Sequence, residues 1–117
     1  MFDSLDILRM AQSFASHAGI RQQAIAQNMA NADTPGFKAR DTVSFNEFFA
    51  ESGNGRGAVD PRDALRIDPN PATRTPDGNT VSLEHEMTRA ASARQQHETA
   101  LGIYSMSRDM LRASIGR

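Results

Sequence analysis

Three histidines, His17, His85 and His97, are the strongest candidate metal ligands in this sequence. A helix brings two ligands together when they are three or four residues apart, and no pair of these histidines has that spacing. The chain also contains no cysteine, which removes thiolate metal sites, disulfides and thiol nucleophiles. The sequence therefore predicts no metal site and no cofactor.

The serines and acidic residues form no catalytic pattern either. No serine lies in a G-x-S-x-G motif, and no strand pattern is present to carry one. Glu84 and Glu86 are two residues apart, so on a helix their carboxylates point apart, and a place near the positive end of the helix dipole explains them. We expect both to be solvated, and we expect no catalytic residues and no enzymatic activity.

Arginines recur in the C-terminal part of the chain, at Arg89, Arg94, Arg108, Arg112 and Arg117. Acidic residues lie among them and weaken any phosphate-binding stripe, so surface or inter-subunit ion pairs explain these arginines better. Arg94, His97 and Arg108 fall on an apolar line of the predicted helix. They would be costly in a dry core unless a neighbouring chain paired them, which indicates an interface.

The most informative segment runs from Gln27 to Asp41. Asn28 and Asn31 lie one turn apart at the end of a predicted helix, where their side chains can bond the freed backbone carbonyls. Thr34 precedes a proline and is biased away from the helical region, and Pro35-Gly36 fits the centre of a type II turn. On physical grounds alone, the segment is a well-made helix stop.

A long amphipathic helix is predicted before this stop, over residues 4–32. Its apolar side, from which we expect polymerisation contacts, includes Leu8, Ala11, Ala15, Ala18, Ile25 and Met29. Alanine allows another helix to approach closely but buries little area per residue. A bundle of several helices therefore suits it better than a solitary pair.

A second long helix is predicted over residues 82–115. Asp77-Gly78 is a strong turn pair, and Ser82 is placed to serve as the N-cap. One apolar stripe of this helix, also an expected polymerisation surface, consists of Leu83, Met87, Ala90, Leu101, Tyr104, Leu111 and Ile115. A neighbouring stripe consists of Ala93, Ala100, Ile103 and Met110. Two stripes imply contacts on two sides, more than a single partner helix covers.

The segment between the helices has two parts. Residues 33–52 hold the turn and a phenylalanine-rich stretch in which Phe45, Phe48 and Phe49 would share one face of a helix. Alternatively, Val43 and Phe45 would share one face of a short strand. Either arrangement makes an apolar patch, which we expect to dock on an adjacent subunit. Residues 53–79 are rich in Gly and Pro and are expected to form a flexible excursion.

The composition is that of one domain, residues 1–117, with a small core. Hydrophobic residues make up 38% of the chain and there is no Trp, so a partner is expected to complete the core. A net charge of -1 gives no general attraction for nucleic acid or anionic membrane. The acidic N-terminus is unlike a secretory signal, and no apolar run approaches the roughly 18 residues of a membrane span.

These patterns predict a mainly α fold. Its long N- and C-terminal helices pack as a coiled-coil-like pair within a polymer, and an irregular Gly/Pro-rich middle segment with little or no β structure joins them.

Taken whole, the turn segment resembles the signature of bacterial flagellar axial proteins, which share an Asn-x-x-Asn-x-x-Thr-Pro-Gly-(aromatic)-Lys pattern near their N-termini. The positions of this pattern are filled here by Asn28, Asn31, Thr34, Pro35, Gly36, Phe37 and Lys38. The later string from Asp77 to Met87, Asp-Gly-Asn-Thr-Val-Ser-Leu-Glu-His-Glu-Met, resembles the proximal-rod branch of that family in particular.

This resemblance implies a structural subunit of the proximal rod in the bacterial flagellar basal body. Such a subunit polymerises through its terminal helices and helps to transmit torque from the membrane ring to the distal rod. The resemblance also implies export through the flagellar type III apparatus without a cleaved signal peptide, followed by assembly in the periplasm. The implied partners are other rod proteins, the ring-to-rod adaptor, the membrane ring and copies of the chain itself.

Two other functions stay open from the residues. A sibling axial protein of the proximal rod would share every N-terminal feature. A helical adaptor or regulatory module of unrelated function would instead form a stable, folded monomer or dimer. An enzyme is a distant third, because the sequence has no convergent set of ionisable groups.

Overall fold

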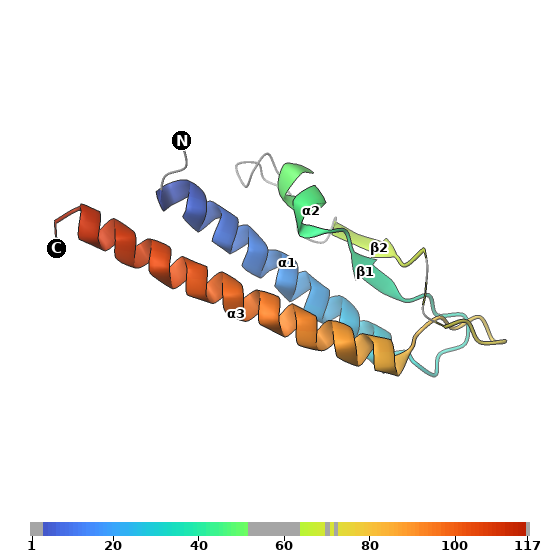
Figure 1. Cartoon of the computed structure of the whole chain (residues 1–117). Helices are drawn as coiled ribbons and strands as arrows, with labels where there is room; N and C mark the ends of the chain where they lie inside the picture. The colour runs from blue at the N-terminus through green and yellow to red at the C-terminus, as the bar shows by residue number, and fades with distance from the viewer. Residues whose placement is uncertain (1–3, 52–63, 70, 72, 117) are drawn as a thin grey trace.

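The computed structural model describes residues 4–51, 64–69, 71 and 73–116. Two long helices, α1 (Ser4–Ala30) and α3 (Leu83–Ser114), lie side by side in antiparallel directions (Figure 1). Between them in sequence come β1 (Arg40–Thr42), α2 (Phe45–Glu51) and β2 (Leu65–Ile67). The molecule is elongated, with principal extents of 63 × 24 × 17 Å. The predicted mainly α fold with paired terminal helices is confirmed.

Helix α1 ends at Ala30, two residues before the predicted boundary at residue 32. The backbone N–H of Ala32 bonds the carbonyl of Met29 at 3.3 Å, three residues back rather than four. Such a bond tightens the last turn into 3₁₀ geometry and satisfies carbonyls that a helix end leaves free. The chain then enters the turn at Thr34, which the following proline keeps out of the helical region.

Helix α3 begins as the sequence predicts. The Ser82 hydroxyl accepts a hydrogen bond from the backbone N–H of His85 at 3.3 Å, which makes Ser82 the N-cap. At the other end, the N–H of Ile115 bonds the carbonyl of Leu111 at 3.1 Å, within one residue of the predicted end. None of the helices in the described part of the chain is long and apolar enough to cross a membrane.

Small side chains form the contact between α1 and α3. The buried residues of the two helices include Ala11, Ala18, Ala24, Ile25, Ala93 and Ala100. On α3, the line that faces α1 is therefore the alanine stripe, whereas the stripe with Leu83, Met87 and Leu101 faces away and stays exposed. Alanine permits close approach of two helices but buries little area, so this core is small.

The phenylalanine-rich stretch is a helix, and the strand alternative is wrong. Helix α2 begins where the Ser44 hydroxyl accepts a hydrogen bond from the N–H of Glu47 at 3.3 Å. The ring of Phe45 lies 6.4 Å from that of Phe48 and 5.4 Å from that of Phe49, measured between centroids. The three rings therefore share one side of α2, as the helical spacing predicts.

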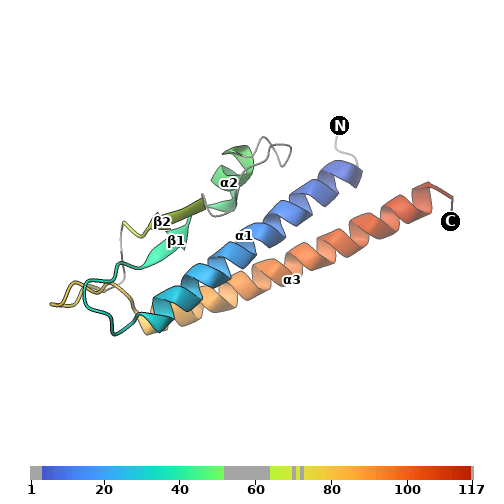
Figure 2. The same cartoon turned by 180° about the vertical axis from the view of Figure 1, so that it is seen from behind.

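A short antiparallel hairpin flanks α2. In its register Arg40 faces Ile67 and Thr42 faces Leu65. We call β1, α2 and β2 together the arm, and α1 runs between the arm and most of α3 in both views (Figure 2). Residues 53–63, 70 and 72 of the predicted excursion lie outside the described residues. The described part of that segment contains β2 and a turn in which the Gly78 N–H bonds the Thr75 carbonyl at 2.9 Å.

Candidate functional site

The two sequence motifs meet at one end of the helix pair. The Asn79 side chain, in the lead into α3, donates two hydrogen bonds to the turn after α1: to the carbonyl of Asn31 at 2.9 Å and to that of Thr34 at 2.8 Å. The backbone N–H of Gly36 bonds the carbonyl of Asp77 at 2.9 Å. Asn79 is buried although asparagine is usually exposed, because backbone carbonyls satisfy both protons of its amide.

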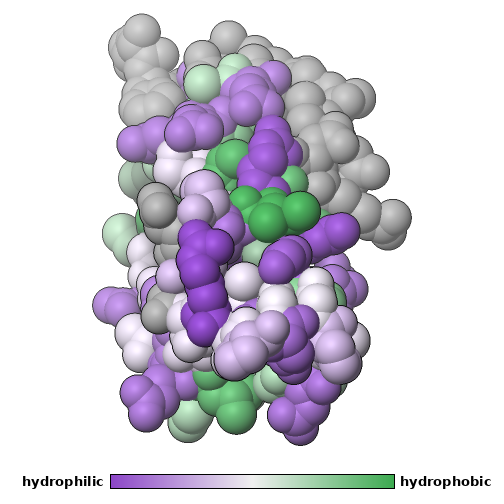
Figure 3. Space-filling model, turned by 90° about the vertical axis from the view of Figure 1, so that its right-hand side faces the viewer, coloured by the Kyte–Doolittle hydropathy of each residue, from purple (hydrophilic) through white to green (hydrophobic). Residues whose placement is uncertain are grey.

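Further bonds extend this join toward β1. The Thr80 N–H bonds the Phe37 carbonyl at 3.0 Å, and the Thr80 hydroxyl accepts from the Ala39 N–H at 2.8 Å. The Lys38 ammonium donates to the Gly78 carbonyl at 2.6 Å. The turn after α1 and the lead into α3 are thus one hydrogen-bonded unit. Hydrophilic residues cover most of this end of the molecule, and apolar residues there form separate patches (Figure 3).

Two glycines make the close approach possible. Gly36 has φ +75°, the left-handed value that the third residue of a type II turn requires, and the Phe37 N–H closes that turn on the Thr34 carbonyl at 3.2 Å. Gly78 has φ +88°, and a Cβ added to it would lie 3.4 Å from the Cα of Gly36. The predicted turns are therefore confirmed, and their backbones lie against each other.

The two motif asparagines have different roles. Asn31 behaves as predicted, because its amide donates to the Gln27 carbonyl at 2.8 Å and braces the helix end. Asn28 does not, and this part of the prediction is wrong. The Asn28 side chain is fully buried, accepts from the Arg40 N–H at 3.0 Å and donates to the Arg40 carbonyl at 2.8 Å. It joins α1 to β1 instead of capping α1.

The prediction of two solvated acids at the start of α3 is correct for Glu84 and wrong for Glu86. Glu86 is 1% exposed, faces α1, and accepts a hydrogen bond from the Asn28 amide at 3.1 Å. Its charge is balanced by Arg89, whose Nη1 lies 2.8 Å from Glu86 Oε2. A buried carboxylate is tolerable here because a cation and an amide both bond it.

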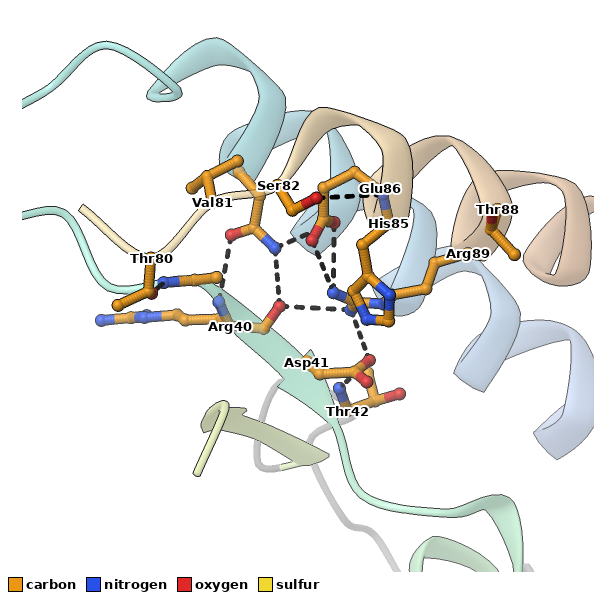
Figure 4. Close-up of polar contacts among 12 residues, drawn as sticks. Arg40, Asp41, Thr42, Thr80, Val81, Ser82, His85, Glu86, Thr88 and Arg89 are labelled. Carbon is orange, nitrogen blue, oxygen red and sulfur yellow. Dashed lines mark hydrogen bonds and ion pairs between the residues drawn. The ribbon is translucent and has the colours of Figure 1, made fainter. Parts of the chain in front are cut away.

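Arg89 carries this network into the arm (Figure 4). Its side chain is buried, and Nη2 lies 2.5 Å from Asp41 Oδ1 and 3.2 Å from the Arg40 carbonyl. The Glu86–Arg89 spacing of three residues is visible in the sequence and typical of a helical ion pair. Nothing in the sequence indicates that the pair is buried, or that Asp41 and Asn28 complete it.

The turn before α3 contains a carboxylate whose pKa is lowered by its hydrogen bonds. Hydrogen bonds from the Thr75 hydroxyl and then from the Asn79 backbone N–H hold the pKa of Asp77 below its ordinary value. Both bonds favour the charged form of the side chain. Asp77 is thus an anionic brace for the turn, which gives its strong turn propensity a structural reason.

His17, the first candidate metal ligand, is a buried structural residue. Its Nε2 lies 2.7 Å from the Val43 carbonyl and its Nδ1 lies 2.8 Å from the Gln96 amide nitrogen. The ring also packs against Phe45 and Phe48, at centroid distances of 5.7 and 5.5 Å. Among the residues that the structure describes, no three His, Asp or Glu side chains are grouped as a metal site.

The predicted docking patch packs mainly on its own chain. Phe45 meets Phe14 of α1 edge to face, with ring centroids 4.8 Å apart, and Phe48 is buried. Phe49 is half-buried. In this structure Phe45 and Phe48 therefore attach the arm to α1, and Phe45 and Phe49 keep part of their surface exposed.

The predicted polymerisation residues divide between the two helices. On α1, Ala11, Ala18 and Ile25 are buried, Leu8 and Ala15 are half-buried, and Met29 is exposed. On α3, Leu83, Met87, Leu101, Tyr104 and Ile115 are exposed, and Ala90 and Leu111 are half-buried. The α1 stripe thus faces into the chain, whereas the α3 stripe remains open along the helix.

Known proteins resemble this chain over almost its full length. A family model described as "Flagella basal body rod protein" matches residues 8–38, which cover most of α1 and the turn motif. The flagellar basal body rod protein FlgB of Escherichia coli (strain K12) is 33% identical, with 90% of each chain covered. The FlgB of Yersinia ruckeri is 33% identical over 88% of this chain and 89% of its own. The FlgB of Agrobacterium fabrum is 24% identical over 97% of this chain and 95% of its own. On this sequence identity and coverage, together with the turn motif at the end of α1, the chain belongs to the FlgB family of flagellar basal body rod proteins.

Proposed function

We propose that this chain is a proximal-rod subunit that polymerises through its terminal helices and helps to transmit torque from the membrane ring to the distal rod. Membership of the FlgB family makes it a structural component of the rod. The finer proposal rests on one observation, the open apolar stripe of α3. Leu83, Met87, Leu101 and Tyr104 lie exposed on a helix whose other side is already packed against α1.

Burial of the exposed stripe against another helix would contribute a large favourable free energy of association. Burying a Leu or Met side chain is worth about 1.5–3 kcal/mol, so several of them on one line favour packing against another helix. The contact between α1 and α3 uses mostly alanines and leaves the isolated chain with a small core. Assembly would add the apolar burial that one chain cannot supply.

The partners follow from the same proposal. Copies of the chain and other rod proteins would cover the α3 stripe, and the ring-to-rod adaptor and the membrane ring would meet the base of the rod. Export without a cleaved signal peptide and assembly in the periplasm complete the proposal, and both rest on the resemblance to rod proteins.

Single substitutions on the stripe test this function in a strain whose own gene is deleted. Leu101→Asp and Met87→Asp place a charge on exposed positions, so the isolated chain should keep its helix content by circular dichroism. Gln95→Asp, on an exposed polar position of the same helix, is the matched control. We expect no motility and no rods on isolated basal bodies in the deletion strain and in the two stripe variants, and normal rods in the control.

Complete rods and normal swimming in the deletion strain would overturn the rod function. Normal rods in both stripe variants would overturn polymerisation through α3. A parent chain that stays a stable, folded monomer or dimer at every concentration would instead favour the helical adaptor.

A further inference from the structure

A buried polar network joins α1, β1 and α3 at one place. It consists of Asn28, Arg40, Asp41, Glu86 and Arg89, and we call it the polar junction (Figure 4). We propose that the polar junction is a positioning site: it fixes the rotation of β1 about its own axis, and so the direction in which β2 projects from the helix pair.

Both ends of β1 are tied independently of the polar junction. Before the strand, the Ala39 N–H bonds the Thr80 hydroxyl at 2.8 Å. After it, the Val43 carbonyl bonds His17 at 2.7 Å, and Phe45 packs on Phe14. A segment held at its two ends can still rotate about the line that joins them. Something between the ends must therefore fix the rotation of β1.

Asn28 supplies that constraint from α1. Successive residues of a strand direct their backbone groups to opposite edges. The Ala39 carbonyl accepts a hydrogen bond from the Asp68 N–H at 2.9 Å, and the Val43 N–H donates one to the Ala64 carbonyl at 2.8 Å. Both residues therefore bond toward β2. The N–H and carbonyl of Arg40 therefore point to the other edge, where the Asn28 amide bonds both, as a neighbouring strand would. Rotation of β1 would break both bonds.

Arg89 supplies the second constraint, from α3. It bonds the same Arg40 carbonyl and the Asp41 carboxylate, while Glu86 balances its charge. Ion-pair hydrogen bonds need a narrow range of directions. The contacts between alanines on the helices fix a distance but little direction. The polar junction is thus the part of the structure best able to define an orientation.

The polar junction is better suited to orientation than to stability. Replacing a buried ion pair by apolar residues of similar size is often neutral or stabilising, because the pair loses hydration when it is buried. The Arg89 Nε is buried and makes no hydrogen bond with the part of the chain that the structure describes. A network selected for stability alone would not need two charges from α3 and one from β1 in this place.

The consequence for assembly rests on the proposed function. Ile67 on β2 is 59% exposed, and β2 lies on the edge of the hairpin away from Asn28. A neighbouring subunit in a rod would meet this strand in the direction that the polar junction sets. Variants of the polar junction should then fold and yet assemble poorly.

Distance measurements between nitroxide labels test the positioning directly, and the absence of native cysteine makes labelling specific. One label pair, Ile67→Cys with Gln95→Cys, reports β2 against α3. The control pair, Gln23→Cys with Gln95→Cys, reports α1 against α3. The variants are Glu86→Leu/Arg89→Met, which removes the buried charges together, and Asp41→Ala, which leaves the Glu86–Arg89 pair intact. Asp109→Ala, at an exposed acid of α3, is the control variant.

We expect one sharp distance for the β2 pair in the parent chain and in Asp109→Ala. In the two variants of the polar junction this distance should shift or broaden, while the α1–α3 pair and the helix content stay unchanged. An unaltered β2 distance in Asp41→Ala and in a folded double variant would overturn the proposal. If the double variant does not fold, Asp41→Ala alone decides.

The two proposals fail separately. Normal rods in the deletion strain would end the rod function but leave the distance result standing. The Asp41→Ala chain can also be expressed in the deletion strain. If it restores as many rods as the parent chain does, although its β2 distance is altered, the claim that this direction matters for assembly is overturned.

Discussion

At the scale of single residues, the two asparagines of the turn motif differ in what surrounds them. Asn28 is fully buried and bonds β1 and Glu86, whereas Asn31 is half-buried and bonds a carbonyl of its own helix and the Thr34 hydroxyl. Removing a side chain that leaves buried groups unsatisfied costs more than removing one whose partners turn to water. Asn28 and Asn31 are therefore expected to contribute different amounts to the free energy of unfolding.

We expect Asn28→Ala to lower the free energy of unfolding by about 2–4 kcal/mol, because it removes the partner of the Arg40 N–H and one of the hydrogen bonds to the buried Glu86. Asn31→Ala should cost only about 0.5–1.5 kcal/mol, because water can replace both of its exposed side-chain hydrogen bonds, to the Gln27 carbonyl and from the Thr34 hydroxyl. Urea denaturation of the two variants measures the difference. Equal losses would contradict the roles assigned to them.

The Asp77 side chain makes the turn before α3 sensitive to acid. Its pKa is lowered in the folded chain, so its contribution is present above the ordinary pKa of aspartate and is lost as the pH falls through the lowered folded value. We expect the carboxyl resonance of Asp77 to titrate below the ordinary range of an aspartate. In Thr75→Val that titration should move back toward the ordinary range, and no movement would contradict the hydrogen-bond origin of the shift.

At the scale of elements, the sequence predicts the helices well because their signals are local. Apolar periodicity places α1 and α3, and Ser82 and Pro35-Gly36 mark a start and a stop through their own backbone chemistry. The strands of the arm are three residues long, too short to show an alternating pattern. The burial of Glu86 and Arg89 depends on α1 and β1 lying over them, which no local pattern encodes.

Gly102 and Gly78 lie in different backbone conformations, so replacing each by alanine should have opposite effects on stability. Gly102 lies inside α3 with nothing within 4 Å of where a Cβ would be, so Gly102→Ala should raise the free energy of unfolding of the isolated chain by about 0.5–1 kcal/mol. Gly78→Ala should lower it, because of the positive φ and the contact with Gly36. Thermal denaturation of both variants checks the opposite signs. A destabilised Gly102→Ala would mean that α3 is less regular than the structure shows.

At the scale of the whole molecule, the open stripe of α3 makes the isolated chain prone to self-association. We expect sedimentation velocity to show a mean mass that rises with protein concentration. Leu101→Asp should suppress the rise, whereas Gln95→Asp should leave it in place, because only the first position belongs to the exposed apolar stripe. A parent chain that stays monomeric at high concentration would argue against the stripe as a contact surface.

The helix pair is also asymmetric in the way it would bear a mechanical load. Its hydrogen-bonded join lies at the turn end, whereas the start of α1 and the finish of α3 are both at the opposite end, where the two ribbons stand apart (Figure 1). A force that pulled these two free ends apart would peel the alanine contacts open one after another. A force along the helix axes, from the turn end toward the free ends, would load all those contacts at once in shear. We therefore expect the helix pair to resist a force along its length better than a force that separates the start of α1 from the finish of α3.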